Sequence, residues 1–289
     1  MKKAVKIIPL VFIFHLLVFW GCDKQEHTLP VDFNLQFEID KKPVMEGRLT
    51  IESIKISLGS IDIDGKREVG ENVFMTRKFE NGETIDVSGT LPENKLSFNL
   101  PQGIYDPLTF LLNFKPDPEE EDLDDDIEDW LEDLEEGDED IEDLQEDLGE
   151  IIEDYLDEVQ PCILVKARYQ RSNIFYHVIF AVNDPLLFRV MARNSEGGIT
   201  VSLSKDRINE GVIVLDPSYW FSVISPSMLE SAFIGIIDDD DDDDDDDNDG
   251  DDDDNGYAKY IFLHKKVNSQ LFTTILNRLE ESTILYIKE

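Results

Sequence analysis

Two stretches of the sequence carry most of its negative charge, and they limit what each part of the chain can fold into. Residues 119–158 hold 25 Asp or Glu and residues 238–254 hold 15 Asp, and neither stretch contains Lys or Arg. The remaining 26 acids balance the 26 Lys and Arg of the chain, so the net charge of −40 belongs to these stretches. A halophilic surface would distribute its acids, and nucleic-acid binding would need a basic stripe to neutralise phosphates. The sequence therefore excludes a halophilic protein and a nucleic-acid-binding protein.

The first acidic stretch has a helical period. Apolar residues recur every three or four positions from Leu123 through Ile141 and Ile151 to Tyr155, and they stay in phase across Gly137. Because glycine in a helix interior costs about 1 kcal/mol, the pattern predicts either one long helix or a hairpin broken near Gly137. Its apolar stripe either covers the rest of the protein or forms a docking face for a basic partner or divalent cations. We expect residues 119–159 to be an acidic helical insertion.

The second acidic stretch holds no apolar residue, and self-repulsion keeps such a chain extended. We expect a poly-Asp loop over residues 238–256. Its spacing Asp-x-Asp-x-Asp/Asn-Gly resembles the first half of an EF-hand-like calcium loop, although the closing Glu is absent. Two alternatives remain, namely a flexible loop that gathers cations loosely and a weak, specific calcium site. The candidate calcium ligands are Asp245, Asp247, Asp249, Asp251, Asp253 and Asn255.

Outside the acidic stretches, apolar and polar residues alternate, as in Val31–Ile39. This period of two is typical of half-buried strands. Turn signals such as Asp64-Gly65 and Asn81-Gly82 separate the strands. Short strands at regular spacing predict a mainly β chain whose body is an antiparallel β-sandwich. The body would comprise residues 31–118 and, with short helices, residues 160–237.

The pattern changes after Leu215. Asp216-Pro217 can cap and begin a helix, and Ser227 to Glu230 has the spacing of a capping box. Residues 257–289 predict a strand, a helix from Asn268 to Glu281 and a closing strand, which form a small α/β C-terminal part that returns to the body.

No motif for catalysis is found. The sequence lacks His-Glu-x-x-His, Gly-x-Ser-x-Gly and a Gly-rich phosphate loop. We therefore expect no enzyme and no cofactor beyond weakly bound Ca²⁺. His177 is interpreted as a histidine on the solvent-facing side of its strand, or one whose hydrogen bonds are made within the protein, rather than as a ligand. Cys162 is interpreted as a buried core residue rather than a nucleophile. Tyr219 and Trp220 are either a platform for stacking sugars or core anchors at a helix start.

The N-terminus predicts export. Three lysines precede an apolar run of about 15 residues, Ile7–Gly21, short of the roughly 20 that a helix needs to cross a bilayer. We expect a signal peptide over residues 1–21 and a tether over residues 22–30. A signal peptide that ends in Gly21-Cys22 resembles those of bacterial lipoproteins, in which the cysteine is acylated. Lipid on Cys22 would then hold the protein at a membrane.

The signal peptide, the β-rich body and the poly-Asp tract together resemble surface or periplasmic lipoproteins of Bacteroidota type. The resemblance implies a place in the cell envelope, at the outer membrane or the cell surface. Two functions remain open. One is a lipid-anchored, non-enzymatic binding or adhesion module for a glycan or protein ligand. The other is a structural or assembly lipoprotein whose acidic segments bind calcium or dock a basic partner.

Overall fold

The structure, a computed structural model, describes residues 29–88, 95–116, 121–136, 140–238 and 257–288. These residues are mainly β, which confirms the expected mainly β class. The strands are β1 (Pro30–Ile39), β2 (Leu49–Arg67), β3 (Val73–Asp86), β4 (Lys95–Pro101), β5 (Gly103–Phe114), β6 (Ile163–Arg171), β7 (Ile174–Val182), β8 (Leu186–Arg193), β9 (Val201–Leu203), β10 (Asn209–Leu215), β11 (Gly235–Asp238), β12 (Tyr257–Leu263) and β13 (Ile284–Lys288).

The described residues also form short and long helices. They are η1 (Met45–Gly47), α3 (Glu121–Glu136), α4 (Ile141–Glu158), α5 (Pro217–Trp220), η3 (Phe221–Val223), α6 (Pro226–Leu229), α7 (Ser269–Leu276) and α8 (Leu279–Ser282). None of these helices combines the length and hydropathy that a membrane span requires.

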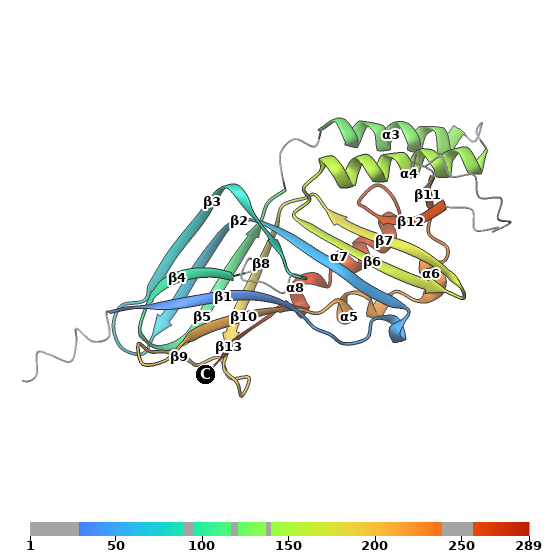
Figure 1. The fold of residues 1–289 in the computed structure, drawn as a ribbon. Helices are drawn as coiled ribbons and strands as arrows, with labels where there is room; N and C mark the ends of the chain where they lie inside the picture. The colour runs from blue at the N-terminus through green and yellow to red at the C-terminus, as the bar shows by residue number, and fades with distance from the viewer. Residues whose placement is uncertain (1–28, 89–94, 117–120, 137–139, 239–256, 289) are drawn as a thin grey trace, which may run out of the picture.

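The strands join in one large, curled, mixed sheet (Figure 1). Its order is β11-β12-β7-β6-β2-β5-β8-β13-β10-β1-β4, with β3 beside β2 and β9 beside β5. The pairs β1–β10, β7–β12 and β8–β13 are parallel, so the expected antiparallel sandwich is replaced by a mixed sheet. Alternation reports which side chains are buried, but it carries no information on the direction of the neighbouring strand.

Strand β2 connects two regions of this sheet. Its first part, Leu49–Ile56, pairs with β6, and its second part, Leu58–Arg67, pairs with β5. The register of both β3 and β5 shifts between Leu58 and Ser60. Because a bulge increases local twist, the sheet changes direction here, and its β5 side curls around the main core (Figure 1).

Gly65 lies inside β2, although Asp64-Gly65 predicts a turn. A Cβ atom at Gly65 would lie 2.6 Å from Cδ1 of Tyr105, whose ring is fully buried. The Tyr105 hydroxyl donates a hydrogen bond to the carbonyl of Pro101. This glycine is therefore required by close packing against an aromatic ring, which the sequence alone cannot separate from a turn signal.

Helices α3 and α4 form a hairpin, so the alternative of one long helix is wrong. They lie side by side over the region of β6, β7, β11 and β12 (Figure 1), and the indole Nε1 of Trp130 donates to the carbonyl of Leu144 at 2.9 Å. Their apolar residues pack on the sheet in a second hydrophobic cluster, which includes Leu164, Ile179 and Phe262. The apolar stripe thus covers the sheet.

The predicted stripe needs one correction in α4. Ile141 is 70% exposed, and Ile152 is buried in place of the half-buried Ile151. The other predicted positions of α4, Leu144, Leu148 and Tyr155, are buried as the heptad phase requires.

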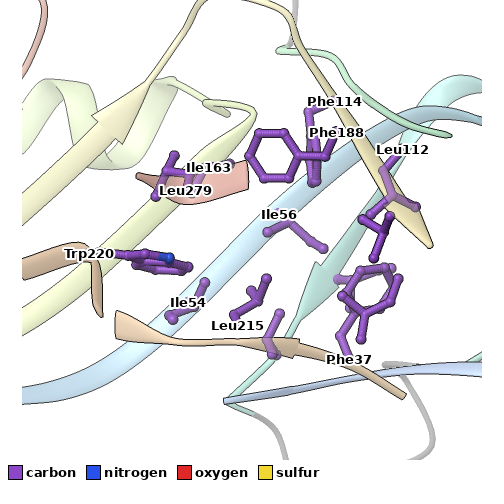
Figure 2. Packing of buried hydrophobic residues seen from close by; sticks show 14 of the residues in the cluster. Phe37, Ile54, Ile56, Leu112, Phe114, Ile163, Phe188, Leu215, Trp220 and Leu279 are labelled. Atoms are coloured by element: carbon purple, nitrogen blue, oxygen red, sulfur yellow. The ribbon is translucent and has the colours of Figure 1, made fainter. Parts of the chain in front are cut away.

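The short helices pack on the main core. Figure 2 shows Trp220 from α5 among buried residues that include Ile54 and Leu279. Strand β12 pairs with β7, and β13 lies between β8 and β10. Residues 257–288 therefore complete the same sheet.

Candidate functional site

An open cleft of about 920 Å³ lies where β1 ends and β2 begins. Its walls come from the second half of β1, the connection from β1 to β2, the first residues of β2, the residues after β3 and the first residue of β4. The lining residues are Gln36, Phe37, Glu38, Ile39, Asp40, Lys41, Lys42, Pro43, Val44, Gly47, Leu49, Thr50, Ile51, Glu52, Val87, Ser88 and Lys95.

A strained turn shapes one wall of the cleft. Met45, Glu46 and Gly47 all have positive φ values, of 48°, 59° and 86°. The amide of Gly47 donates to the carbonyl of Val44 at 2.8 Å, and Val44 forms an isolated bridge with Leu49. Non-glycine residues seldom adopt this left-handed conformation, so the surrounding structure must hold it.

Lys42 ties the cleft wall to helix α5. Its ammonium Nζ lies 2.7 Å from the carboxylate of Asp40 and 3.2 Å from that of Asp216. Hydrogen bonding to Asp40, and then to Asp216, raises the pKa of Lys42 above its usual value. The connection from β1 to β2 is thereby fixed against α5.

Asp216 caps α5. Its carboxylate accepts a hydrogen bond from the Tyr219 amide at 3.1 Å and another from the Ser218 hydroxyl. Burial by itself raises the pKa of Asp216, but these hydrogen bonds and the ion pair with Lys42 outweigh burial and hold it below its usual value.

Of the two alternatives for Tyr219 and Trp220, the structure favours the core anchor over the sugar-stacking platform for the indole of Trp220. Trp220 is 1% exposed, and its Nε1 donates to the hydroxyl of Ser282 at 2.6 Å. The guanidinium carbon of Arg278 lies 3.8 Å from the ring centroid of Tyr219, whose hydroxyl donates to Glu281 at 3.0 Å. One face of the tyrosine is therefore already occupied.

The remaining candidates divide between core and surface. Cys162 is fully buried, as expected for a core residue. His177 is half-buried and stacks on Tyr260, with ring centroids 4.9 Å apart. Cys22 lies outside the described residues, as do the candidate calcium ligands Asp245, Asp247, Asp249, Asp251, Asp253 and Asn255. Within the described ranges, no cluster of three or more His, Cys, Asp or Glu has metal-binding geometry.

Sequence reasoning missed the cleft. The break in alternation at Asp40-Lys41-Lys42-Pro43 was its only local signal, and it marks a connection without revealing that β2, β3 and β4 converge there. No protein family, curated protein or solved structure matches this chain. The geometry of the cleft and the N-terminal signal are therefore the features that point to a function.

Proposed function

We propose that this chain is a non-enzymatic, lipid-anchored binding protein of the cell envelope, and that the cleft is its ligand site. The position of the cleft relative to the tether carries the proposal. Strand β1 begins at Pro30, shortly after Cys22, and ends at the cleft with Ile39. A strand of ten residues spans about 33 Å, so the cleft lies towards the opposite end of β1 from the start of the strand, where the proposed tether joins it.

The chemistry of the cleft favours a protein ligand over a glycan. Sugar sites commonly offer an exposed aromatic face, whereas the aromatic residue in this lining, Phe37, is fully buried. The exposed rim carries charges of both signs, including Lys41, Glu52 and Lys95. Such a rim can pair with both acidic and basic side chains of a peptide segment.

The backbone of β2 offers a second means of recognition. Residues Thr50 to Glu52 line the cleft, and the described pairing of β2 with β3 begins only at Lys55. An extended peptide can add to a sheet edge of this kind through main-chain hydrogen bonds, while side-chain pockets provide specificity.

Site-specific cross-linking tests this proposal. A photo-cross-linker placed on Thr50→Cys, in cells that make the lipidated protein, should capture a protein partner. The buried thiol of Cys162 should stay unlabelled in the native fold. The same label on Leu187→Cys, an exposed position on β8, is the matched control and should capture nothing specific.

Two further experiments distinguish a protein ligand from a glycan. Exchanging the rim charges, with Glu52→Lys and Lys95→Glu, should reduce the Thr50 adduct. Retention of the wild type on a polysaccharide column, lost in that double variant, would identify a glycan ligand. Absence of both the adduct and the retention would show that the cleft is not a binding site.

A second candidate is a structural or assembly lipoprotein in which residues 119–159 act as an acidic insertion between β5 and β6. One observation favours it. Helix α4 packs against β11, and Asp238 at the end of β11 directly precedes the rest of the poly-Asp tract. The exposed acids of α4 and the start of that tract therefore lie on the same side of the molecule, where calcium or a basic partner could bind.

Calorimetric titration with Ca²⁺ and Mg²⁺ at physiological salt tests this second candidate, on the wild type and on a variant with Asp249→Ser and Asp253→Ser. A loose ion atmosphere should bind weakly and with little selectivity, and the substitutions should have a small effect. A saturable, calcium-selective isotherm at roughly 10⁻⁴–10⁻³ M, abolished by the two substitutions, would favour a specific calcium site.

A further inference from the structure

Four exposed aliphatic residues, each from a separate segment, gather at the end of the sheet where β1 begins. Leu29 precedes β1, Val69 lies between β2 and β3, Ile104 lies near the start of β5, and Ile208 lies between β9 and β10. Their exposed fractions are 49%, 56%, 43% and 77%. We call these four residues the apolar rim.

Backbone hydrogen bonds hold the first three segments together. The amide of Glu68, next to Val69, donates to the carbonyl of Ile104 at 3.0 Å. The amide of Gln102, at the turn into β5, donates to the carbonyl of Leu29 at 3.0 Å. The side chains of the rim are therefore presented by backbone that is hydrogen-bonded from one segment to the next.

The fourth segment is attached through β9. Ile104 pairs with Ser202, and the guanidinium of Arg207 donates to the carbonyl of Ser202. Arg207 immediately precedes Ile208, so the turn that carries Ile208 is tied to β9, which pairs with the start of β5. The four segments that carry the rim are thus linked to one another at one end of the sheet.

The turns that carry the rim are electrically balanced, unlike the acidic stretches. Residues 66–72 and 204–208 together hold four basic and three acidic residues. One of them, the buried Arg67, donates to the carbonyls of Glu71 at 2.8 Å and Gln102 at 3.3 Å. An anionic lipid surface would not repel this end of the molecule.

We propose that the apolar rim rests on the lipid surface, with its aliphatic side chains in the interfacial layer of the bilayer. This inference depends on the proposed lipid anchor. Cys22 precedes Leu29 by seven residues, which span at most about 25 Å when extended. The tether thus keeps the rim near the membrane, and interfacial binding strengthens with the apolar area buried. Helices α3 and α4 then lie at the far end of the molecule, away from the lipid (Figure 1).

Leu187 provides a matched control for the rim. It is an aliphatic residue with 57% exposure, and it pairs with Asn113 near the end of β5. Ile104 lies near the other end of that strand, about 30 Å away at 3.3 Å per residue. A probe on Leu187 should therefore stay in water when the rim contacts lipid.

The test uses the full lipidated protein in vesicles of phosphatidylethanolamine and phosphatidylglycerol. An environment-sensitive fluorophore is attached to Ile208→Cys, to Val69→Cys or to the control Leu187→Cys. Vesicle flotation reports the anchor independently of the fluorescence. We expect all three to float, and we expect a blue shift and quenching by brominated lipids at Ile208 and Val69 and neither at Leu187.

Two results would overturn the inference. If the proteins float but the rim probes respond no more than Leu187, the rim does not contact lipid, while the anchor stands. If the proteins do not float, the lipid anchor fails and the inference fails with it.

Discussion

Gly149 on α4 and Gly235 on β11 face each other so closely that the helix meets the strand backbone to backbone. A Cβ atom at Gly149 would lie 1.9 Å from the carbonyl oxygen of Ile236, and one at Gly235 would lie 3.0 Å from the amide nitrogen of Gly149. Glycine normally weakens a helix interior. Here it is needed, because any side chain would push α4 away from β11.

Gly149→Ala should destabilise the protein by about 1–3 kcal/mol, because overpacking at a backbone contact outweighs the higher helix propensity of alanine. Urea denaturation measures the change in free energy of unfolding. The control is Glu150→Ala, an exposed position on the same helix, which should have an effect below about 0.5 kcal/mol. Equal stability of Gly149→Ala and wild type would contradict the close approach.

Replacing residues 119–158 with a short Gly/Ser linker should leave β-sheet structure but destabilise it. The change exposes Leu164, Ile179 and Phe262, which the hairpin of α3 and α4 covers. Binding of a hydrophobic dye and a lower urea midpoint are the expected signals. An unchanged midpoint without dye binding would mean that the hairpin contributes nothing to the core.

Tyr105 should limit stability at high pH. Burial raises its pKa to about 12, from an ordinary value of 10.0, against opposition from the nearby Arg67 guanidinium. Because the folded-state pKa is the higher one, the contribution to stability is complete below pH 10 and is lost as the pH rises towards 12.

Tyr105→Phe checks this assignment. It should cost about 1 kcal/mol at neutral pH, because the carbonyl of Pro101 loses its hydrogen-bond donor. Between pH 10 and 12 its stability should fall less steeply than that of the wild type, in urea denaturation at each pH. Parallel curves for the two proteins would be inconsistent with a raised tyrosine pKa.

Asp216 should limit stability at low pH. Its folded-state pKa is below the ordinary 3.8, so its contribution is present above that pH and is lost as the pH falls through the folded-state pKa. Asp216→Asn should therefore be less stable at neutral pH and lose less stability on acidification below pH 4. Lys42→Met removes the ion pair with Asp216, so it should also reduce the stability at neutral pH and the loss of stability below pH 4, by less than Asp216→Asn does. Lys41→Met, at the exposed neighbouring position, should change neither.

Cys22→Ser should abolish membrane association, because lipid on this cysteine is the proposed anchor. Fractionation followed by a salt wash measures the partition between membrane and soluble fractions, with Cys162→Ser as the matched control. Persistent membrane binding of Cys22→Ser would point to an uncleaved N-terminal anchor instead.

Local sequence patterns predicted several elements correctly. Alternation over residues 31–39 and 174–182 corresponds to β1 and β7, because each strand has a fixed period of two. Asp216 caps α5 as its position before Pro217 indicates. Other boundaries were wrong: Ser225, and not Ser227, caps α6, and the predicted helix from Asn268 to Glu281 is divided into α7 and α8.

By itself, the sequence determined strands such as β1 and β7 and the cap of α5, because periodicity and capping depend on neighbours a few residues apart. It did not identify β3, within which Asn81-Gly82 had indicated a turn. Tertiary structure alone decided the parallel pairing of β1 with β10, the packing of Gly65 under Tyr105 and the cleft beside Lys42. Each of these joins residues far apart in the chain. Their formation depends on shape and on burial shared between segments, and no local pattern records which distant segment supplies the partner.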